Sequence, residues 1–431
     1  CQFDGPFFIL SLIVDYFSFL IIVELIVLID WYFSIYLRKI KININMNDQN
    51  YKMVATTMLG LEEVLFEELK KLGAQHIHIL NRAVEFVGDK GFMYKANLNL
   101  RTAIRILKPI FEFKAQNEKD LYRKIYNYNW EKHFGVENTF AIQSSGISEI
   151  FSHSKYTALK AKDAIVDFFR DSYGKRPDVN VESPDVQINI HVRENKFTVS
   201  LDSSGYSLHK RGYKITSVDA PINEVLAAGL ILLSDWNQLS NFHDPMCGSG
   251  TILIEAAMIA NNIPANIFRK RFGFEGWKNF DSDLWEKIRD ISLEKEKEYY
   301  GVITGSDKFQ KSLRSCRANI NNALMRDEIK VKLEDFFESN IKPNTHVIFN
   351  PPYGERMPIN INEFYQRIGD TLKHNYQGSS VWLISSDLEN LKMIGLRPSK
   401  KIKVFNGKLE CRFLRFDIYE GSKKQSKQKR M

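Results

Sequence analysis

Cysteine is scarce in this sequence, whose 431 residues include only four. Cys1, Cys247, Cys316 and Cys411 lie far apart, and no CxxC pair occurs. Disulfide frameworks and structural zinc sites need paired or clustered cysteines, so we expect neither, and we expect a reducing, cytoplasmic compartment. The nine histidines form no HExxH pair, and we predict no metal.

A Walker A loop is also absent, because no glycine-rich stretch continues into Gly-Lys-Ser or Gly-Lys-Thr. One glycine-rich turn nevertheless follows a predicted strand over 239–243 and precedes an alanine-rich apolar helix. This turn consists of Asp244, Pro245, Met246, Cys247, Gly248, Ser249, Gly250 and Thr251. Its glycines permit a positive φ and let a ligand approach the backbone, and the helix start offers N–H donors to an anionic group.

Asp244 indicates which ligand suits this turn. A carboxylate at that position would repel a phosphate and would accept hydrogen bonds from an ammonium group. A ligand that carries both an ammonium and a carboxylate is an amino acid, such as the methionine part of S-adenosylmethionine. The predicted cofactor-binding residues of the turn are therefore Asp244, Pro245, Cys247, Gly248, Ser249, Gly250 and Thr251.

Two later acidic residues end predicted strands. Asp307 closes the stretch 302–307, and an acidic residue at the end of the second strand takes ribose hydroxyls in nucleotide-binding α/β folds. Asp335 follows the predicted strand 329–334 and either meets the adenine amine of the cofactor or caps a helix or turn. Both alternatives for Asp335 stay open at this point.

The apolar strand predicted over 346–349 runs into Asn350, Pro351, Pro352 and Tyr353. The Asn350 amide oxygen and the Pro351 carbonyl are acceptors, and an exocyclic NH2 on a base has two hydrogens to offer. The prolines restrict φ and lack N–H donors, so the bend is stiff, and the tyrosine ring gives a flipped base a flat face. We predict that these four residues are catalytic and that Asn350 also contacts the cofactor; a plain proline turn is the alternative.

This series of motifs resembles the THUMP-containing class I S-adenosylmethionine-dependent RNA methyltransferases, and among them the bacterial guanine-N2 methyltransferases of 23S ribosomal RNA. The resemblance rests on 244–251, 305–307 and 350–356, with support from 201–213 and 220–224, and it extends from about Tyr51 to Tyr419. It implies an α/β fold in which a Rossmann-like class I methyltransferase domain follows α+β ferredoxin-like and THUMP domains.

The resemblance divides the chain into a ferredoxin-like domain at 51–108, a THUMP RNA-binding domain at 109–203 and a methyltransferase domain at 204–420. Apolar residues at helical spacing predict a helix over 61–72, which Gly73 ends. Further predicted elements are a helix over 157–169 and strands over 186–192 and 196–201.

RNA is the expected partner, since the net charge is +8 and the isoelectric point is near 9.0. Lys155 precedes the predicted THUMP helix and Lys160 lies in it. Free N–H groups at the helix start can bind phosphate, and the two lysines belong to a patch that either binds RNA or consists of solvated surface charges. Arg356 either bonds the guanine edge or braces its loop. Basic and aromatic residues alternate over 269–278, which either contact single-stranded RNA or hold this insertion against the core.

The resemblance implies methyl transfer to the exocyclic N2 of a guanine in structured RNA, with 23S ribosomal RNA as the first choice of substrate. A tRNA guanine-N2 methyltransferase and an adenine-N6 methyltransferase are alternatives, because Asn-Pro-Pro-Tyr serves either amine. A noncatalytic RNA-binding ribosome-assembly factor of the same fold is the most distant alternative.

The first 45 residues differ in composition from the rest. They are almost wholly apolar from 7 to 37, with three acids inside one potential span, which would be costly in a bilayer. We interpret them as a spurious upstream extension, with translation starting near Met46, so that a membrane contact is not expected; a genuine anchor is the alternative. The basic tail at 421–431 is expected to be disordered.

Overall fold

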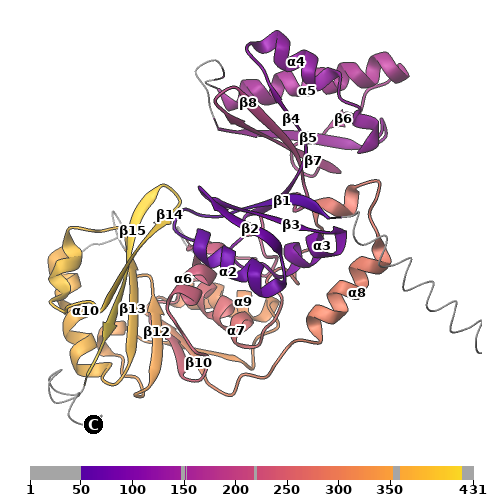
Figure 1. Cartoon of the computed structure of the whole chain (residues 1–431). Coiled ribbons are helices and arrows are strands. Elements are labelled where there is room, and N and C mark those ends of the chain that lie inside the picture. The colour runs from indigo at the N-terminus through magenta and orange to yellow at the C-terminus, as the bar shows by residue number, and fades with distance from the viewer. Residues whose placement is uncertain (1–49, 147–150, 152, 218–220, 353–359, 420–431) are drawn as a thin grey trace, which may run out of the picture. The chain divides into compact units, whose positions relative to one another are not determined.

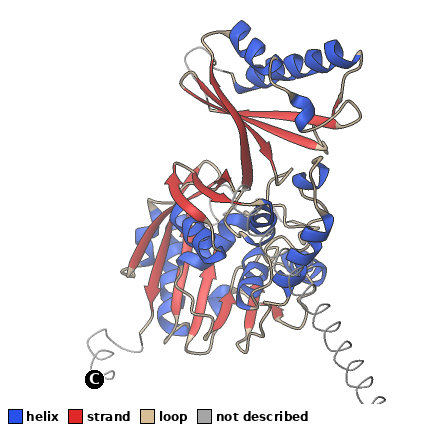
Figure 2. Ribbon diagram, turned by 45° about the vertical axis from the view of Figure 1, so that its right-hand side comes forward, coloured by secondary structure: helices blue, strands red, loops and turns tan. Residues whose placement is uncertain are grey.

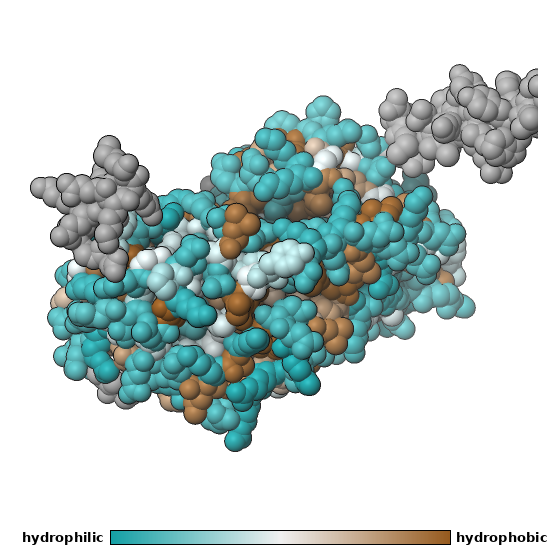
Figure 3. Space-filling view, turned by 90° about the horizontal axis from the view of Figure 1, so that it is seen from below, coloured by the Kyte–Doolittle hydropathy of each residue, from teal (hydrophilic) through white to brown (hydrophobic). Residues whose placement is uncertain are grey.

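The described part of the chain, seen here in a computed structural model, is organised around two β-sheets (Figure 1). The described residues are 50–146, 151, 153–217, 221–352 and 360–419. The apolar first 45 residues and the basic tail at 421–431 lie outside the described residues. Among the described residues, no helix combines the length and apolar character needed to cross a bilayer. On the face drawn in Figure 3, hydrophilic side chains predominate and apolar ones form patches between them.

The first sheet has eight strands in the order β2-β3-β1-β4-β8-β7-β5-β6. Its first elements are β1 (Tyr51–Thr56), α2 (Glu62–Leu72), β2 (Gln75–Leu80), β3 (Ala83–Gly88) and α3 (Lys90–Asn99). Helix α2 confirms the helix predicted over 61–72: Leu65 and Leu69 are buried, and Gly73 ends the helix with φ 96°.

Strand β4 (Arg105–Lys114) belongs to both halves of this sheet. Its residues 105–107 pair antiparallel with β1, and its residues 107–114 pair antiparallel with β8 (Lys196–Asp202). The register shifts between Pro109 and Phe111, where the proline has no N–H to donate. A domain boundary at 108/109 therefore falls inside one continuous strand.

The second half of the sheet carries two helices that pack on each other. Its elements, besides β8, are α4 (Glu118–Tyr126), η1 (Trp130–Lys132), β5 (Thr139–Ser145), α5 (Ser154–Tyr173), β6 (Asp178–Val179) and β7 (Val186–Arg193). The predicted helix over 157–169 is confirmed within α5, which runs from Ser154 to Tyr173. The predicted strands 186–192 and 196–201 correspond to β7 and β8.

The second sheet has seven strands in the order β11-β10-β9-β12-β13-β15-β14, with helices on both faces (Figure 2). The five strands from β11 to β13 are parallel, and β15 and β14 are antiparallel additions. The strands are β9 (Asn241–Asp244), β10 (Ile303–Asp307), β11 (Ile329–Leu333), β12 (Thr345–Phe349), β13 (Ser380–Ser385), β14 (Lys400–Asn406) and β15 (Leu409–Asp417). The helices are α6 (Glu224–Leu233), α7 (Thr251–Ala260), η2 (Gly273–Gly276), α8 (Ser282–Leu293), α9 (Gln310–Asn322), η3 (Phe336–Glu338), α10 (Ile361–Asn375) and η5 (Asn390–Ile394).

Successive side chains of β12 point to opposite faces of this sheet, so they belong to two different apolar clusters. Ile348 belongs to the apolar cluster formed with α6, α7 and α9, whereas Val347 and Phe349 belong to the cluster formed with α10 and η5. Strand order reverses at β9, because β10 and β11 continue to one side and β12 and β13 to the other. In open parallel sheets, such a switch point is where ligands bind, at the carboxyl ends of the strands.

A buried ion pair helps to join the first domain to the second sheet. Arg211 and Glu255 are both 0% exposed, and the Arg211 Nε lies 3.2 Å from the Glu255 Oε1. The same guanidinium donates to the Arg101 carbonyl, and the Asn266 side chain donates to the Asn97 carbonyl at 2.8 Å. A charge this deeply buried needs a partner, so the pair ties the segments together.

The insertion at 269–281 is held against the core. Phe272, Phe274 and Trp277 are buried, and the Arg271 guanidinium pairs with Asp185 of the THUMP-like half at 3.1 Å. Of the two interpretations left open by the sequence, these aromatic side chains therefore have the packing role. They are not available to stack on RNA bases in this arrangement.

Candidate cofactor and catalytic site

Three polar residues singled out from the sequence meet at one edge of the second sheet. Asp244 ends β9, Asp307 ends β10, and Asn350 follows β12 directly. The three strands are parallel, with Gly305 opposite Asp244 and Val347 opposite His243. Their carboxyl ends therefore lie at the same edge, at the switch point of the strand order.

The glycine-rich turn between β9 and α7 is attached to β10 by its backbone. The Cys247 N–H donates to the Ser306 carbonyl at 2.9 Å, and the Gly248 N–H donates to the Asp307 Oδ2 at 3.0 Å. Gly248 and Gly250 have φ of 54° and 83°, as expected for residues that favour glycine. A Cβ on Gly250 would lie 2.7 Å from the Cys316 Sγ on α9, so glycine is needed there for space as well.

The Asp244 carboxyl is buried, with only 1% of the residue exposed. Its Oδ1 accepts a hydrogen bond from the Met246 N–H at 3.1 Å. Burial raises the pKa of Asp244 well above its ordinary value, and the nearby Asp307 charge adds to this effect. A buried carboxylate without a cation is costly, and a bound ammonium group would remove that cost, so the site fits the amino-acid end of S-adenosylmethionine.

Asp307 has a role that the sequence did not predict. Its Oδ2 accepts from the Gly248 N–H, and its Oδ1 accepts from the Phe309 N–H at 2.8 Å. The side chain therefore fixes the glycine-rich turn and the start of α9 relative to β10. A ribose contact, as predicted from the sequence, would use the remaining lone pairs of the same oxygens.

Asp335 lies close to Asp307, because the Glu334 N–H donates to the Asp307 carbonyl at 3.2 Å. Its Oδ1 accepts from the Phe337 N–H at 3.0 Å and so caps η3. Of the two alternatives for Asp335, the cap is present in the structure. Its contact with adenine stays a prediction.

Asn350 has an unsatisfied acceptor in its side chain. Its Oδ1 is buried and has no hydrogen-bond partner among the described residues. Buried acceptors are nearly always paired, so an orphan at a strand end in the ligand crevice points to a missing donor. The Thr251 Oγ1, at the first residue of α7, is likewise buried without a partner in the described part of the chain. Pro351 is buried, and Pro352 is half-buried.

Comparison with known proteins shows which domains and relatives this chain matches. Residues 211–415 match the RMKL-like methyltransferase domain, residues 115–202 the THUMP domain and residues 52–107 the RlmL ferredoxin-like domain. A putative RNA methyltransferase of Synechocystis, slr0064, is 36% identical over 371 residues, which are 85% of this chain and 96% of that protein. The chain belongs to the THUMP-containing class I S-adenosylmethionine-dependent RNA methyltransferases.

Longer relatives and solved structures agree with this assignment. The ribosomal RNA large subunit methyltransferase K/L of Marinomonas is 36% identical over 389 residues, which are 88% of this chain and 54% of that enzyme. The chain thus spans about half the length of that relative. A putative methyltransferase, SMU.472, solved with S-adenosylhomocysteine, is 30% identical with a TM-score of 0.77, covering 87% of this chain and 100% of its own. S-adenosylmethionine is the cofactor of this methyltransferase family, and the predicted fold class is confirmed.

The structure does not place all predicted residues of the methyltransferase at this edge. Tyr353 and Arg356 lie outside the described residues. Lys155 and Lys160 lie on α5 of the THUMP domain, in a different part of the molecule from Asn350. Lys160 borders a cleft of about 370 Å³, whose lining also includes Lys162, Arg170 and Arg176.

Two of the cations that line this THUMP cleft have carboxylate partners. Lys162 pairs with Asp163, and Arg170 pairs with Asp167, each at 2.7 Å. Arg170 and Arg176 were not predicted from the sequence as part of this basic patch, although their position in and just after the same helix was a usable signal.

Asn319 of the methyltransferase domain is a further residue that the sequence did not indicate. It is 0% exposed on α9; its Oδ1 accepts from the Ile215 N–H at 2.9 Å and its Nδ2 donates to the Ser249 carbonyl at 2.9 Å. Asn319 therefore connects the glycine-rich turn to the segment of the methyltransferase domain that precedes α6. An asparagine inside a helix carries no such signal until its neighbours are known.

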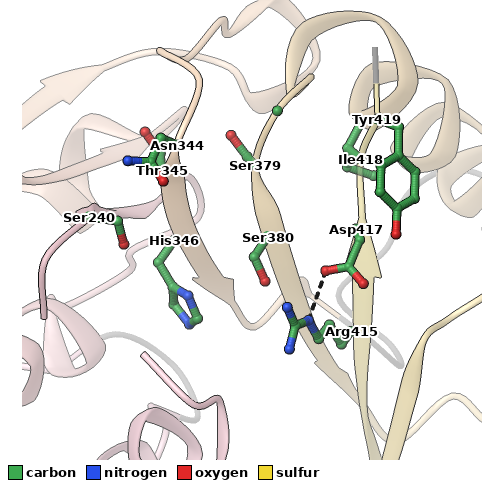
Figure 4. A pocket seen from close by; sticks show the side chains of 11 residues that line it. Ser240, Asn344, Thr345, His346, Ser379, Ser380, Arg415, Asp417, Ile418 and Tyr419 are labelled. Carbon is green, nitrogen blue, oxygen red and sulfur yellow. Dashed lines mark hydrogen bonds and ion pairs between the residues drawn. The ribbon is translucent and has the colours of Figure 1, made fainter. Parts of the chain in front are cut away.

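A second cleft of about 370 Å³ lies at the opposite edge of the methyltransferase sheet (Figure 4). Thr345 and His346, which begin β12, line it together with Ser379, Ser380 and Arg415. Because β12 ends at Phe349, directly before Asn350, this cleft is separated from the candidate site by the length of the strand. None of the residues predicted from the sequence borders it.

Proposed function

We propose that the chain transfers the methyl group of S-adenosylmethionine to the exocyclic N2 of a guanine in structured RNA, specifically large-subunit ribosomal RNA. The observation that carries this proposal is the buried, unpartnered Oδ1 of Asn350 at the end of β12. An amine donor is the group that such an acceptor lacks. The ribosomal RNA substrate is supported by relatives named ribosomal RNA large subunit methyltransferase K/L.

The chemistry depends on how the target amine is held. The lone pair of an exocyclic amine is conjugated with the ring and is a poor nucleophile. Asn350 Oδ1 and the Pro351 carbonyl accept hydrogen bonds from the two N–H groups of the amine. These hydrogen bonds favour a more tetrahedral nitrogen and direct its lone pair away from the ring. Such preorganised acceptors lower the barrier by positioning and electrostatics.

The cofactor supplies a methyl group bonded to a positively charged sulfur. In this proposal Asp244 accepts hydrogen bonds from its ammonium group, Asp307 accepts from its ribose hydroxyls, and Asp335 accepts from its adenine amine. Thr251 and the backbone of the glycine-rich turn hold the amino-acid end, through residues that include Pro245, Cys247, Gly248, Ser249 and Gly250. When the new N–C bond forms, the electron pair of the broken C–S bond stays on sulfur and one amine proton leaves to solvent.

RNA contacts complete the proposal. Tyr353 stacks on the target base, which must leave its own stack, and Arg356 bonds the guanine edge. Lys155 and Lys160 of the THUMP domain bind phosphates, which position the enzyme without reading sequence. We place the protein in the cytoplasm, where ribosomal RNA is its substrate.

Adenine N6 is the second candidate target. Asn350 and Pro351 would serve that amine equally well, and one solved relative with 27% identity and a TM-score of 0.77 is described as a predicted N6-adenine-specific DNA methylase. The THUMP domain favours RNA over DNA as the substrate class. Nucleoside mass spectrometry of ribosomal and transfer RNA from a deletion strain distinguishes these options: loss of N2-methylguanosine from large-subunit RNA is expected, and loss of N6-methyladenosine instead contradicts the proposal.

Two variants of the full chain test the assignment of roles. Asn350→Ala should abolish methyl transfer to RNA while S-adenosylhomocysteine binds with wild-type affinity, because the acceptor serves the target amine. Asp307→Ala should raise the dissociation constant of S-adenosylhomocysteine by at least tenfold, because both the ribose contact and the anchoring of Gly248 are lost. Methyl transfer by Asn350→Ala at a rate near wild type would refute the catalytic assignment.

A further inference from the structure

Helix α9 presents a basic face beside the cofactor edge. Lys311, Arg314 and Arg317 are exposed, and their spacing of three residues places them within one face of the helix. The other side of α9 packs on the sheet through Leu313, Cys316 and Ile320, which are buried. We call Lys311, Arg314 and Arg317 the α9 basic face.

The charge of this face is not compensated. From Lys308 to Met325 the sequence has four lysines and arginines and no aspartate or glutamate. Within the described residues, no ion pair joins any of the three side chains of the α9 basic face to a carboxylate, and Arg317 makes one long hydrogen bond of 3.5 Å to the Val331 carbonyl. By contrast, the exposed Lys196 and Lys403 pair with glutamates at 2.6 Å.

The position of α9 relates this charge to the candidate catalytic site. The helix begins at Gln310, three residues after Asp307. Because β10, β9 and β12 are parallel, its first turn lies at the same edge of the sheet as Asn350, which follows β12. Strand β10 is two places from β12 in the sheet, which corresponds to about 10 Å. Lys311 and Arg317 are six residues apart, a rise of about 9 Å along the helix.

We propose that the α9 basic face binds backbone phosphates of the RNA strand that carries the target nucleotide, within a few nucleotides of it. This inference rests on the proposed function. A base held at Asn350 brings its neighbouring phosphates to the same edge of the sheet, and an uncompensated row of cations attracts them. An acidic protein would also complement the positive charge of the α9 basic face, but the adjacent site proposed to modify RNA favours RNA as the binding partner.

Charge reversal on α9 tests the proposal in the full-length protein. The variant K311E/R314E/R317E should bind unmodified large-subunit ribosomal RNA, transcribed in vitro, at least tenfold more weakly than the wild type. Loss of three phosphate contacts should also reduce the slope of log affinity against log salt by about 2. S-adenosylhomocysteine affinity should stay within about twofold of wild type, because none of the three side chains belongs to the proposed cofactor site.

Two further variants make the result specific. K287E/K401E/K408E reverses three exposed lysines on α8, β14 and the turn after β14, and should bind RNA as the wild type does. K311A/R314A/R317A should show a loss in the same direction as the reversal variant, without added negative charge. Wild-type RNA affinity and salt slope in the α9 variants, or an equal loss in the K287E/K401E/K408E control, would overturn the inference.

Methyl transfer by the wild-type protein is measured separately. If the wild type does not methylate any RNA, the proposed function fails irrespective of α9. If it methylates RNA and the α9 variants bind and methylate that RNA normally, the inference about α9 alone fails.

Discussion

Gly250 offers the sharpest test of how the cofactor turn is built. Its φ is 83°, and an added Cβ would lie 2.7 Å from the Cys316 Sγ. The backbone strain of alanine in the left-handed region costs about 1–2 kcal/mol. Overpacking against the sulfur adds about 1–3 kcal/mol, because both groups lie in a buried, close-packed region. Gly250→Ala should therefore lower the free energy of unfolding by about 2–5 kcal/mol.

Cys316→Ala separates the two contributions. Removing the sulfur leaves the positive φ at Gly250 but eliminates the close contact, so the Gly250→Ala penalty should shrink to the backbone part in this background. In the double-mutant cycle, the double variant should then be more stable than the sum of the two single effects predicts, by a coupling energy of about 1–3 kcal/mol. Gly73→Ala is a matched control, since Gly73 has φ 96° and nothing within 4 Å of an added Cβ. It should show the backbone part alone.

Urea unfolding of the four proteins of the cycle measures these energies. Calorimetric titration with S-adenosylhomocysteine adds a functional readout, because a turn displaced by the clash should bind this product of the cofactor more weakly. The affinity should fall about tenfold for each 1.4 kcal/mol of strain that distorts the binding conformation of the turn. Additivity within about 0.5 kcal/mol would refute the reasoning, since it would mean that Gly250 and Cys316 do not meet.

Two other variants test buried charges of the methyltransferase domain. Burial raises the pKa of Asp244 well above its ordinary 3.8, so the folded carboxyl holds its proton more tightly than the unfolded chain does, and the cofactor-free protein loses stability as pH rises from the ordinary value through the raised one. Asp244→Asn should therefore raise the melting temperature of the cofactor-free protein at pH 7 while weakening S-adenosylhomocysteine binding; a lower melting temperature would count against the buried carboxylate. Glu255→Gln removes the ion-pair partner of the fully buried Arg211 charge and should cost about 3–5 kcal/mol in urea unfolding. Glu410→Gln, which removes the surface pairs of Glu410 with Lys403 and Arg412, is its control and should leave the unfolding midpoint nearly unchanged.

The strands that carry the site could be predicted because each is short, apolar and followed by a distinctive polar residue. Strand β12 ends at Phe349, immediately before Asn350, and β10 ends at Asp307 itself, as the patterns indicated. The role of Asp335 could not be predicted, because an acidic residue after a strand suits a cap and a ligand contact equally well. The aromatic residues at 269–278 posed the same difficulty, since burial depends on segments distant in sequence.

The sequence by itself determined the chemistry that this protein can carry: a turn with two glycines beside Asp244, and a rigid acceptor bend at Asn350 and Pro351. Those properties are local, because they depend on φ restrictions and on the acceptors of adjacent residues. Only the tertiary structure decided that β9 lies between β10 and β12, which brings Asp244, Asp307 and Asn350 to one edge. It also decided that Cys316 excludes a side chain at Gly250 and that the α9 basic face borders the same edge. Such contacts join residues tens of positions apart, and strand order and packing, not local pattern, set them.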